Sequence, residues 1–178
     1  MAIVPMADAV AGQIASSTEY NKIIDNVIDL DTRLTGIGGT RYNMERRLNA
    51  TTSITSGANT KVPFDTSVVA GSGITYTGGT TRSFTLTNAG VYQITSSLRL
   101  ATSSECYLWA APTANQFADH GKTSIPSGSL NIGMSTSVRA SAGEAWSIWT
   151  WLGTTVNLAR EGASTNAPWV KIEYIGPL

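Results

Sequence analysis

The chain has 178 residues, enough for one domain with an appendage, and its twelve basic and twelve acidic side chains give a formal net charge of zero. Charged residues make up 13% of the sequence, against ~25% in an average soluble domain. This balance excludes general nucleic-acid binding, which needs a surplus of Lys and Arg to displace counterions. So few charges also suggest that other subunits cover much of the surface.

The sequence contains no pattern for export, membrane insertion or disulfide bonding. Cys106 is the single cysteine, so no disulfide can form within the chain, and its apolar neighbours predict a buried, inert thiol. The first ten residues lack a basic segment and a long apolar segment, so they do not form a signal peptide. The longest uncharged run that leans apolar, residues 145–159, is shorter than the ~20 residues of a membrane helix and is interrupted by Gly and Thr. We expect synthesis in a cytoplasm and no membrane insertion.

Residues 1–35 predict an arm followed by a short helix. Residues 1–16 have no clear period and suggest an extended arm. Ser16 and Glu19 match a capping box, and Gly36 is a plausible helix stop. Between them, apolar side chains recur at spacings of three and four, as in the seam of a coiled coil: Tyr20, Ile23, Val27, Leu30 and Leu34. Two heptads are marginal alone, so the helix either docks on its own domain or joins other copies in a bundle at an oligomer axis.

Residues 41–60 predict a second short helix and then a linker. Residues 41–48 can form the helix, and they carry the one basic cluster, Arg41, Arg46 and Arg47. This cluster is either a solvated face or a subunit-docking patch. Residues 49–60 are rich in Thr, Ser, Gly and Asn, as linkers are. We therefore divide the chain into an N-terminal part, residues 1–60, and a compact head, residues 61–178.

The head has the spacing of strands and turns that is typical of an all-β domain, with short apolar runs separated by Gly-, Ser- and Asn-rich turns. We expect strands at residues 62–65, 74–76, 83–87, 91–100, 106–110, 130–139, 145–152, 156–159 and 169–175. Strict alternation in several runs predicts one buried face per strand, and eight or nine such strands suggest an antiparallel jelly-roll sandwich. The expected core residues are Phe84, Tyr92, Ile94, Leu98, Ile132, Met134, Val138, Ile172 and Tyr174.

The run over residues 145–152 breaks the alternation. Trp146, Ile148 and Leu152 share one parity, while Trp149 and Trp151 take the other, so both faces of this strand carry large apolar groups. A bare face with two tryptophans would promote aggregation, so something must cover it. We expect another subunit as the cover and place Trp149 and Trp151 in an oligomer interface, with a bound ligand such as a sugar ring as the alternative.

The sequence has no constellation that indicates catalysis. His120 is the single histidine and lies beside Asp119 in a predicted surface loop, which does not supply the geometry of a triad. Acids are scattered one at a time, and His and Cys are too few for a transition-metal site, although calcium held partly by backbone carbonyls stays open. We therefore predict no enzyme activity, no cofactor and no metal; a hydrolase using His120 is the weakest alternative.

Residues 60–177 resemble the C1q/TNF-like jelly-roll family. The motifs that carry the resemblance are Pro63-Phe64, Phe84 followed by the run from Ala89 to Ile94, the turn from Ser137 to Trp146, and the closing run from Trp169 to Gly176. Two positions depart from the family pattern, because Ile94 replaces an aromatic residue and Glu144 replaces an aspartate. The resemblance implies a trimer packed along aromatic and aliphatic strand faces, and it would explain the strand that carries Trp149 and Trp151.

The N-terminal part is similar to the start of many minor tail and capsid-surface proteins of tailed bacteriophages, which have a "G-x-x-(I/L)-x-A-x-x-(Y/W)-N" segment before a short helix. Gly12, Tyr20 and Asn21 carry this similarity. Together the two resemblances imply a structural virion protein, a homotrimeric fibre or decoration that attaches to capsid or tail proteins through residues 1–48. The alternative is a module that binds host-surface glycans through the region of Trp109 or residues 112–129.

Overall fold

The computed structural model describes residues 43–48, 50–71, 73–159 and 168–178, and within these ranges the chain forms only β-strands. The predicted N-terminal arm and helix, with the seam residues Tyr20, Ile23, Val27, Leu30 and Leu34, lie outside the described residues. The chain divides into two compact units, residues 1–41 and 42–178, and all described residues belong to the second unit.

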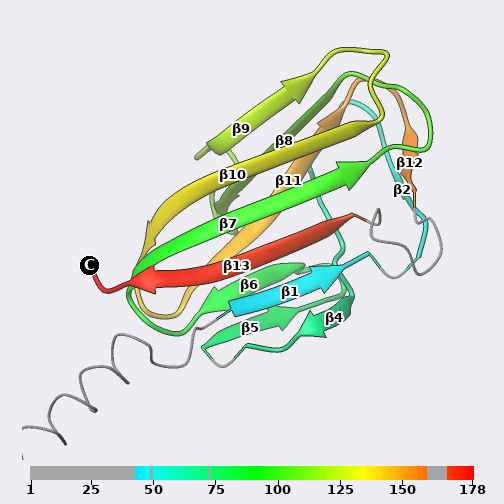
Figure 1. Cartoon of the computed structure of the whole chain (residues 1–178). Helices are drawn as coiled ribbons and strands as arrows, with labels where there is room; N and C mark the ends of the chain where they lie inside the picture. Colours follow the sequence, from blue (N-terminus) through cyan, green and yellow to red (C-terminus); the bar gives the residue numbers. More distant parts are fainter. Residues whose placement is uncertain (1–42, 49, 72, 160–167) are drawn as a thin grey trace, which may run out of the picture. The chain divides into compact units, whose positions relative to one another are not determined.

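Two antiparallel sheets form the head (Figure 1). The first sheet has the order β10-β7-β13-β1-β4, with strands β10 (Asn131–Ala140), β7 (Gly90–Arg99), β13 (Trp169–Gly176), β1 (Asn43–Arg47) and β4 (Thr66–Val69). The second sheet has the order β5-β6-β11-β8-β9, with strands β5 (Ile74–Thr77), β6 (Ser83–Leu86), β11 (Glu144–Leu152), β8 (Cys106–Pro112) and β9 (His120–Ile125). Strand β3 (Thr60–Lys61) also pairs with β11, and β2 (Thr52–Ile54) pairs with β12 (Val156–Leu158).

The alternation in the sequence explains how the long strands bury one face. Along β7 the residues alternate between buried and half-buried over the whole strand, and β7 pairs with β10 in an unbroken register from Arg99↔Asn131 to Gly90↔Ala140. On its other side β7 pairs with β13, with Ile94 opposite Ile172. Apolar side chains from both sheets then meet between the layers in one continuous core.

The predicted core residues are placed by the structure as follows. Phe84, Ile94, Leu98, Ile132, Met134, Val138 and Ile172 are buried, as is Tyr92, whose hydroxyl donates to the carbonyl of Asn88 at 2.8 Å. Tyr174 is half-buried and packs edge-on against Tyr92, with ring centroids 5.1 Å apart.

The region between residues 41 and 60 differs from the prediction. Residues 43–47 form β1, which pairs with β13 and β4, so the helix predicted over residues 41–48 is wrong. Residues 52–54 and 60–61 pair with β12 and β11, so they are head strands rather than a linker. The two compact units accordingly divide after residue 41, and the predicted boundary after residue 60 is wrong. Backbone pairing with distant strands overrides the helix propensity of this segment.

Candidate functional site: an aromatic hollow on the second sheet

Aromatic side chains gather on the face of the second sheet that points away from the core. The register of β8 and β11 sets Trp109 opposite Trp149 and Tyr107 opposite Trp151. Directly opposed residues on one face of an antiparallel pair are in contact range, and aromatic pairs there stabilise the sheet. The rings of Tyr107 and Trp151 meet edge-to-face with centroids 5.4 Å apart. With Ala111 these residues form a second apolar cluster, separate from the core between the sheets.

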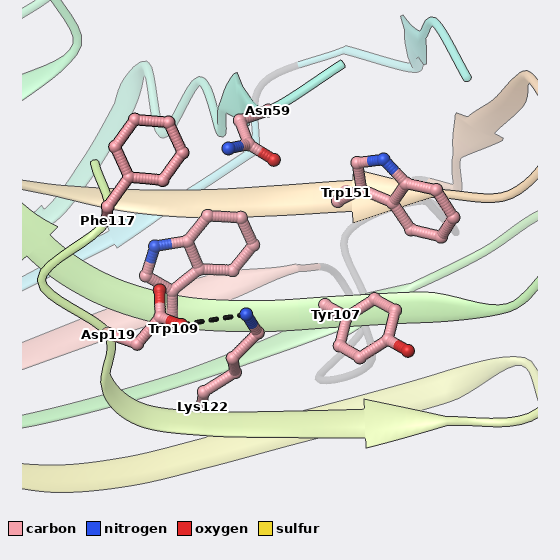
Figure 2. A pocket seen from close by; sticks show the side chains of 7 residues that line it. All are labelled: Asn59, Tyr107, Trp109, Phe117, Asp119, Lys122 and Trp151. Carbon is pink, nitrogen blue, oxygen red and sulfur yellow. Dashed lines mark hydrogen bonds and ion pairs between the residues drawn. The ribbon is translucent and has the colours of Figure 1, made fainter. Parts of the chain in front are cut away.

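An open hollow of about 240 Å³ lies on this face (Figure 2). Its lining combines aromatic rings with a few polar groups: Asn59, Tyr107, Trp109, Phe117, Asp119, Lys122 and Trp151. Figure 2 shows Phe117 and Trp151 at the two ends of the hollow, with Trp109 between them. An apolar lining with a few convergent polar groups is the usual composition of a small-molecule site.

Hydrogen bonds hold the loop between β8 and β9 in a defined conformation beside the hollow. The Asn115 amide donates to the Pro112 carbonyl at 2.9 Å, and the Asn115 side-chain oxygen accepts from the Phe117 amide at 3.2 Å. The indole nitrogen of Trp109 donates to the Gln116 carbonyl at 2.9 Å, which ties the loop to the sheet. The loop therefore fixes Phe117 at the rim, where its side chain is 75% exposed.

Lys122 and Asp119 supply the charges of the hollow. The Lys122 ammonium lies 2.8 Å from a carboxylate oxygen of Asp119, and it lies over the rings of Trp109 and Tyr107 at 5.2 Å and 5.4 Å from their centroids. The Tyr107 hydroxyl donates to Glu105 at 2.9 Å, and this hydrogen bond, with the charge of Glu105, raises the pKa of Tyr107. The phenol therefore stays neutral, and the opposite charges of Asp119 and Lys122 cancel.

Trp149 and Trp151 were predicted to need a cover from another subunit. In the single chain Trp149 is only 8% exposed, because β3 pairs beside it and the Lys61 ammonium lies 5.2 Å from its ring centroid. Its indole N–H is buried and has no hydrogen-bond partner among the described residues. Trp151 is half-buried at the end of the hollow. The place of both residues in an oligomer interface stays a prediction.

The other residues singled out in the sequence take structural positions. His120 begins β9 instead of lying in a loop, and its ring packs edge-to-face on Trp146 with centroids 5.0 Å apart. Cys106 is buried, and burial raises the pKa of its thiol. Arg46 binds backbone carbonyls and Arg47 pairs with Glu45, while Arg41 lies outside the described residues. In the described ranges, no group of three or more His, Cys, Asp or Glu side chains is placed to hold a metal ion.

The sequence pointed to only part of this hollow. The region of Trp109 and the loop that carries Phe117 and Asp119 were named as a possible sugar-binding region. Lys122 also falls in that region, residues 112–129, whereas Asn59 was missed because it lay in a predicted linker. Tyr107 could have been found, since its parity in residues 106–110 puts it on the same face as Trp109.

Within the described ranges, no helix has the length and hydropathy of a membrane-spanning segment. The sequence matches no protein-family model and is similar to no curated protein at a significant level.

Solved structures share the fold. PRD1 vertex protein P5 aligns with a TM-score of 0.56 and 15% identity, over 77% of this chain and 98% of that one. Murine APRIL aligns with a TM-score of 0.51 and 10% identity, over 75% of this chain and 98% of that one. Eiger TNF from S. frugiperda aligns with a TM-score of 0.51 and 10% identity, over 78% and 95%. The chain therefore has a C1q/TNF-like antiparallel jelly-roll fold, as the sequence motifs predicted.

Proposed function

We propose that the chain is a structural virion protein of a bacteriophage, a homotrimeric fibre or decoration whose jelly-roll head is displayed on the tail or the capsid. The observation that carries this proposal is the likeness of the head fold to PRD1 vertex protein P5 along nearly all of that chain. The phage-like start of the sequence supports it independently, and the low charge content favours burial against other subunits. Attachment runs through the residues before the head, because residues 43–48 belong to the head itself.

Light scattering on the full chain tests the assembly. At micromolar concentration we expect a mass of three times the 18.8 kDa of one chain. Val27→Asp, in the predicted seam, should lower that mass, because a charge in an apolar helix seam is costly to bury. The neighbouring Asn26→Asp is the matched control and should leave the mass unchanged, because position 26 lies off the seam. A stable monomer of the unaltered chain contradicts the proposal.

Labelling of assembled particles tests the location. An antibody against the head should decorate phage particles at the tail or capsid surface in electron micrographs, and absence of label from intact particles, with label on the free protein, contradicts a place on the virion surface.

A second candidate function is binding of host-surface glycans. The observation that favours it is the aromatic hollow, which is open in the single chain and is lined by a half-buried tryptophan at one end and an exposed phenylalanine at the other. The two functions are compatible, because a displayed head can also recognise a surface. We propose no catalytic role, since neither His120 nor Cys106 meets a second group suited to nucleophilic catalysis among the described residues.

A further inference from the structure

We propose that the hollow between Phe117 and Trp151 is a binding site for one uncharged pyranose ring. This inference rests on the second candidate function above and names its ligand class and its residues. A pyranose has flat faces of C–H groups and a rim of hydroxyls, so its site needs aromatic surface for the faces and hydrogen-bonding groups for the rim. The lining has both.

The aromatic part of the site is built from both strands and the loop. Tyr107 and Trp151 are half-buried and touch each other edge-to-face, so parts of both rings stay open to the hollow. Trp109 is 2% exposed and forms the floor. Phe117 is 75% exposed although the loop that carries it is well fixed. A large apolar side chain held in solvent at the rim of an apolar hollow gains burial when a ligand fills that hollow.

The polar part suits hydroxyl groups. Asp119 offers carboxylate oxygens as acceptors, Lys122 offers ammonium protons as donors, and the amide of Asn59 offers both. Asp119 and Lys122 are each exposed, and their charged atoms lie 2.8 Å apart. Two neighbouring sugar hydroxyls can therefore bind to the carboxylate and the ammonium at a low desolvation cost, because neither charged group is buried. The volume of about 240 Å³ lies below the ~300–1,000 Å³ of most small-molecule pockets, which suits one ring better than a chain of sugars.

The charge arrangement argues against charged ligands. Aromatic rings with a carboxylate attract quaternary ammonium groups, but here the Lys122 ammonium already lies over two of the rings and pairs with Asp119. An anionic sugar would have to compete with Asp119 for the same ammonium. A neutral sugar can bind while Lys122 stays over the rings and stays paired with Asp119. We therefore expect the site to bind neutral sugars more tightly than charged ligands.

The site is formed before binding, which reduces the entropy cost of association. Trp109 is fixed by its hydrogen bond to the Gln116 carbonyl, Tyr107 by its bond to Glu105, and Phe117 by the turn at Asn115.

The experiment is saturation-transfer NMR on the full-length protein. The probes are the methyl glycosides of glucose, galactose and mannose and N-acetylglucosamine, tested against N-acetylneuraminic acid, glucuronic acid and choline. We expect transfer to the ring protons of at least one neutral sugar, and weaker or no transfer to the charged probes. Phe117→Ser should weaken binding about tenfold or more, and Asp119→Asn should weaken it as well. Leu178→Ser, which removes a side chain of similar exposure (68%) far along the chain, should leave binding unchanged.

Several results overturn the inference. One is the absence of transfer to every neutral sugar while circular dichroism shows a folded protein. Others are tighter binding of a charged probe, or binding that Phe117→Ser does not change. A further contradicting result combines two measurements. If Trp151→Ala lowers the mass seen by light scattering and the unaltered chain binds no sugar, a second copy of the chain occupies the hollow in place of a sugar. Because the mass of the unaltered chain is measured in the same samples, loss of sugar binding with a trimer present is distinguishable from failure of the proposed assembly.

Discussion

Arg46 makes a testable contribution to stability that its place in a basic cluster did not suggest. Its side chain crosses from β1 to the segment before β4, where Nε donates to the Phe64 carbonyl at 2.6 Å and a terminal nitrogen donates to the Asp65 carbonyl at 2.8 Å. The guanidinium also lies 4.1 Å from the ring centroid of Tyr76. Phe64 is fully buried, and its own amide donates to the Tyr76 hydroxyl at 3.2 Å. One arginine and one tyrosine thus satisfy both backbone groups of a residue that belongs to no strand.

Arg46→Met keeps the length of the side chain and removes the guanidinium. The bond to Phe64 is partly buried and charge-assisted, which is worth about 1.5–3 kcal/mol, whereas the exposed bond to Asp65 and the stacking on Tyr76 add about 1 kcal/mol together. We therefore expect Arg46→Met to lower the free energy of unfolding by about 3 kcal/mol, and Tm by roughly 10 °C for a domain of this size. Arg46→Lys should have a free energy of unfolding between those of the unaltered chain and Arg46→Met, because an ammonium lacks the planar, forked donors with which arginine binds two carbonyls at once.

The assay is urea unfolding at one fixed protein concentration, followed by tryptophan fluorescence, because the proposed assembly would make the apparent stability depend on concentration. Arg47→Met is the matched control from the next position of the same strand. Among the described residues its side chain pairs only with Glu45, at 2.9 Å and partly exposed, so its loss should cost less than about 1 kcal/mol. A loss below about 1 kcal/mol for Arg46→Met, or equal losses for both variants, would refute the assignment of Arg46 as the clamp of this segment.

Two further predictions concern the core. Gly90→Ala should lower the free energy of unfolding in urea by about 1–3 kcal/mol, because an added Cβ would collide with the Tyr174 ring and lie 2.6 Å from the Gly176 carbonyl oxygen. Gly176→Ala should cost less, because a Cβ there meets no atom within 4 Å. The reverse order of the two losses would count against this packing. The Cys106 thiol should react with an aromatic disulfide reagent far more slowly in the native protein at pH 8 than in urea, because burial blocks access and raises its pKa, which lowers the thiolate fraction; equal rates in both states would contradict its burial.

The strands that the sequence predicted are those in which apolar and polar side chains alternate, so that one face is buried and the other faces solvent. In β7 and in most of β10 and β13 the more buried residues recur at every second position, so the period could be read from the chain. The missed strands have no such pattern. Strands β4 and β9 lie at sheet edges. Strand β9 is mostly polar, β4 leaves both of its valines exposed, and β1 buries only Met44 fully. Their stability comes from backbone pairing with neighbours far away in sequence, which no local pattern records.

The hollow was harder to predict than the fold, because its residues come from distant segments. The sequence showed that β11 carries apolar groups on both faces, but it could not show that β3 and Lys61 cover Trp149 within the same chain. The loop hydrogen bonds that hold Phe117 at the rim involve Pro112, Asn115 and Gln116, residues that indicate only a turn when read along the chain.

The internal cover of Trp149 changes what the aromatic face of β11 implies. Two bare tryptophans required a partner on aggregation grounds alone, and that requirement led to the prediction of an oligomer interface there. With Trp149 only 8% exposed, the apolar surface left beside the hollow is that of Trp151, Tyr107 and Phe117. Three partly open aromatic side chains with polar groups beside them are the composition of a small-molecule site, whereas a standard subunit interface draws on about 20–30 residues from each partner. The proposed trimer and the proposed ligand therefore need not compete for one surface, and a head displayed as we propose would keep this face free for recognition.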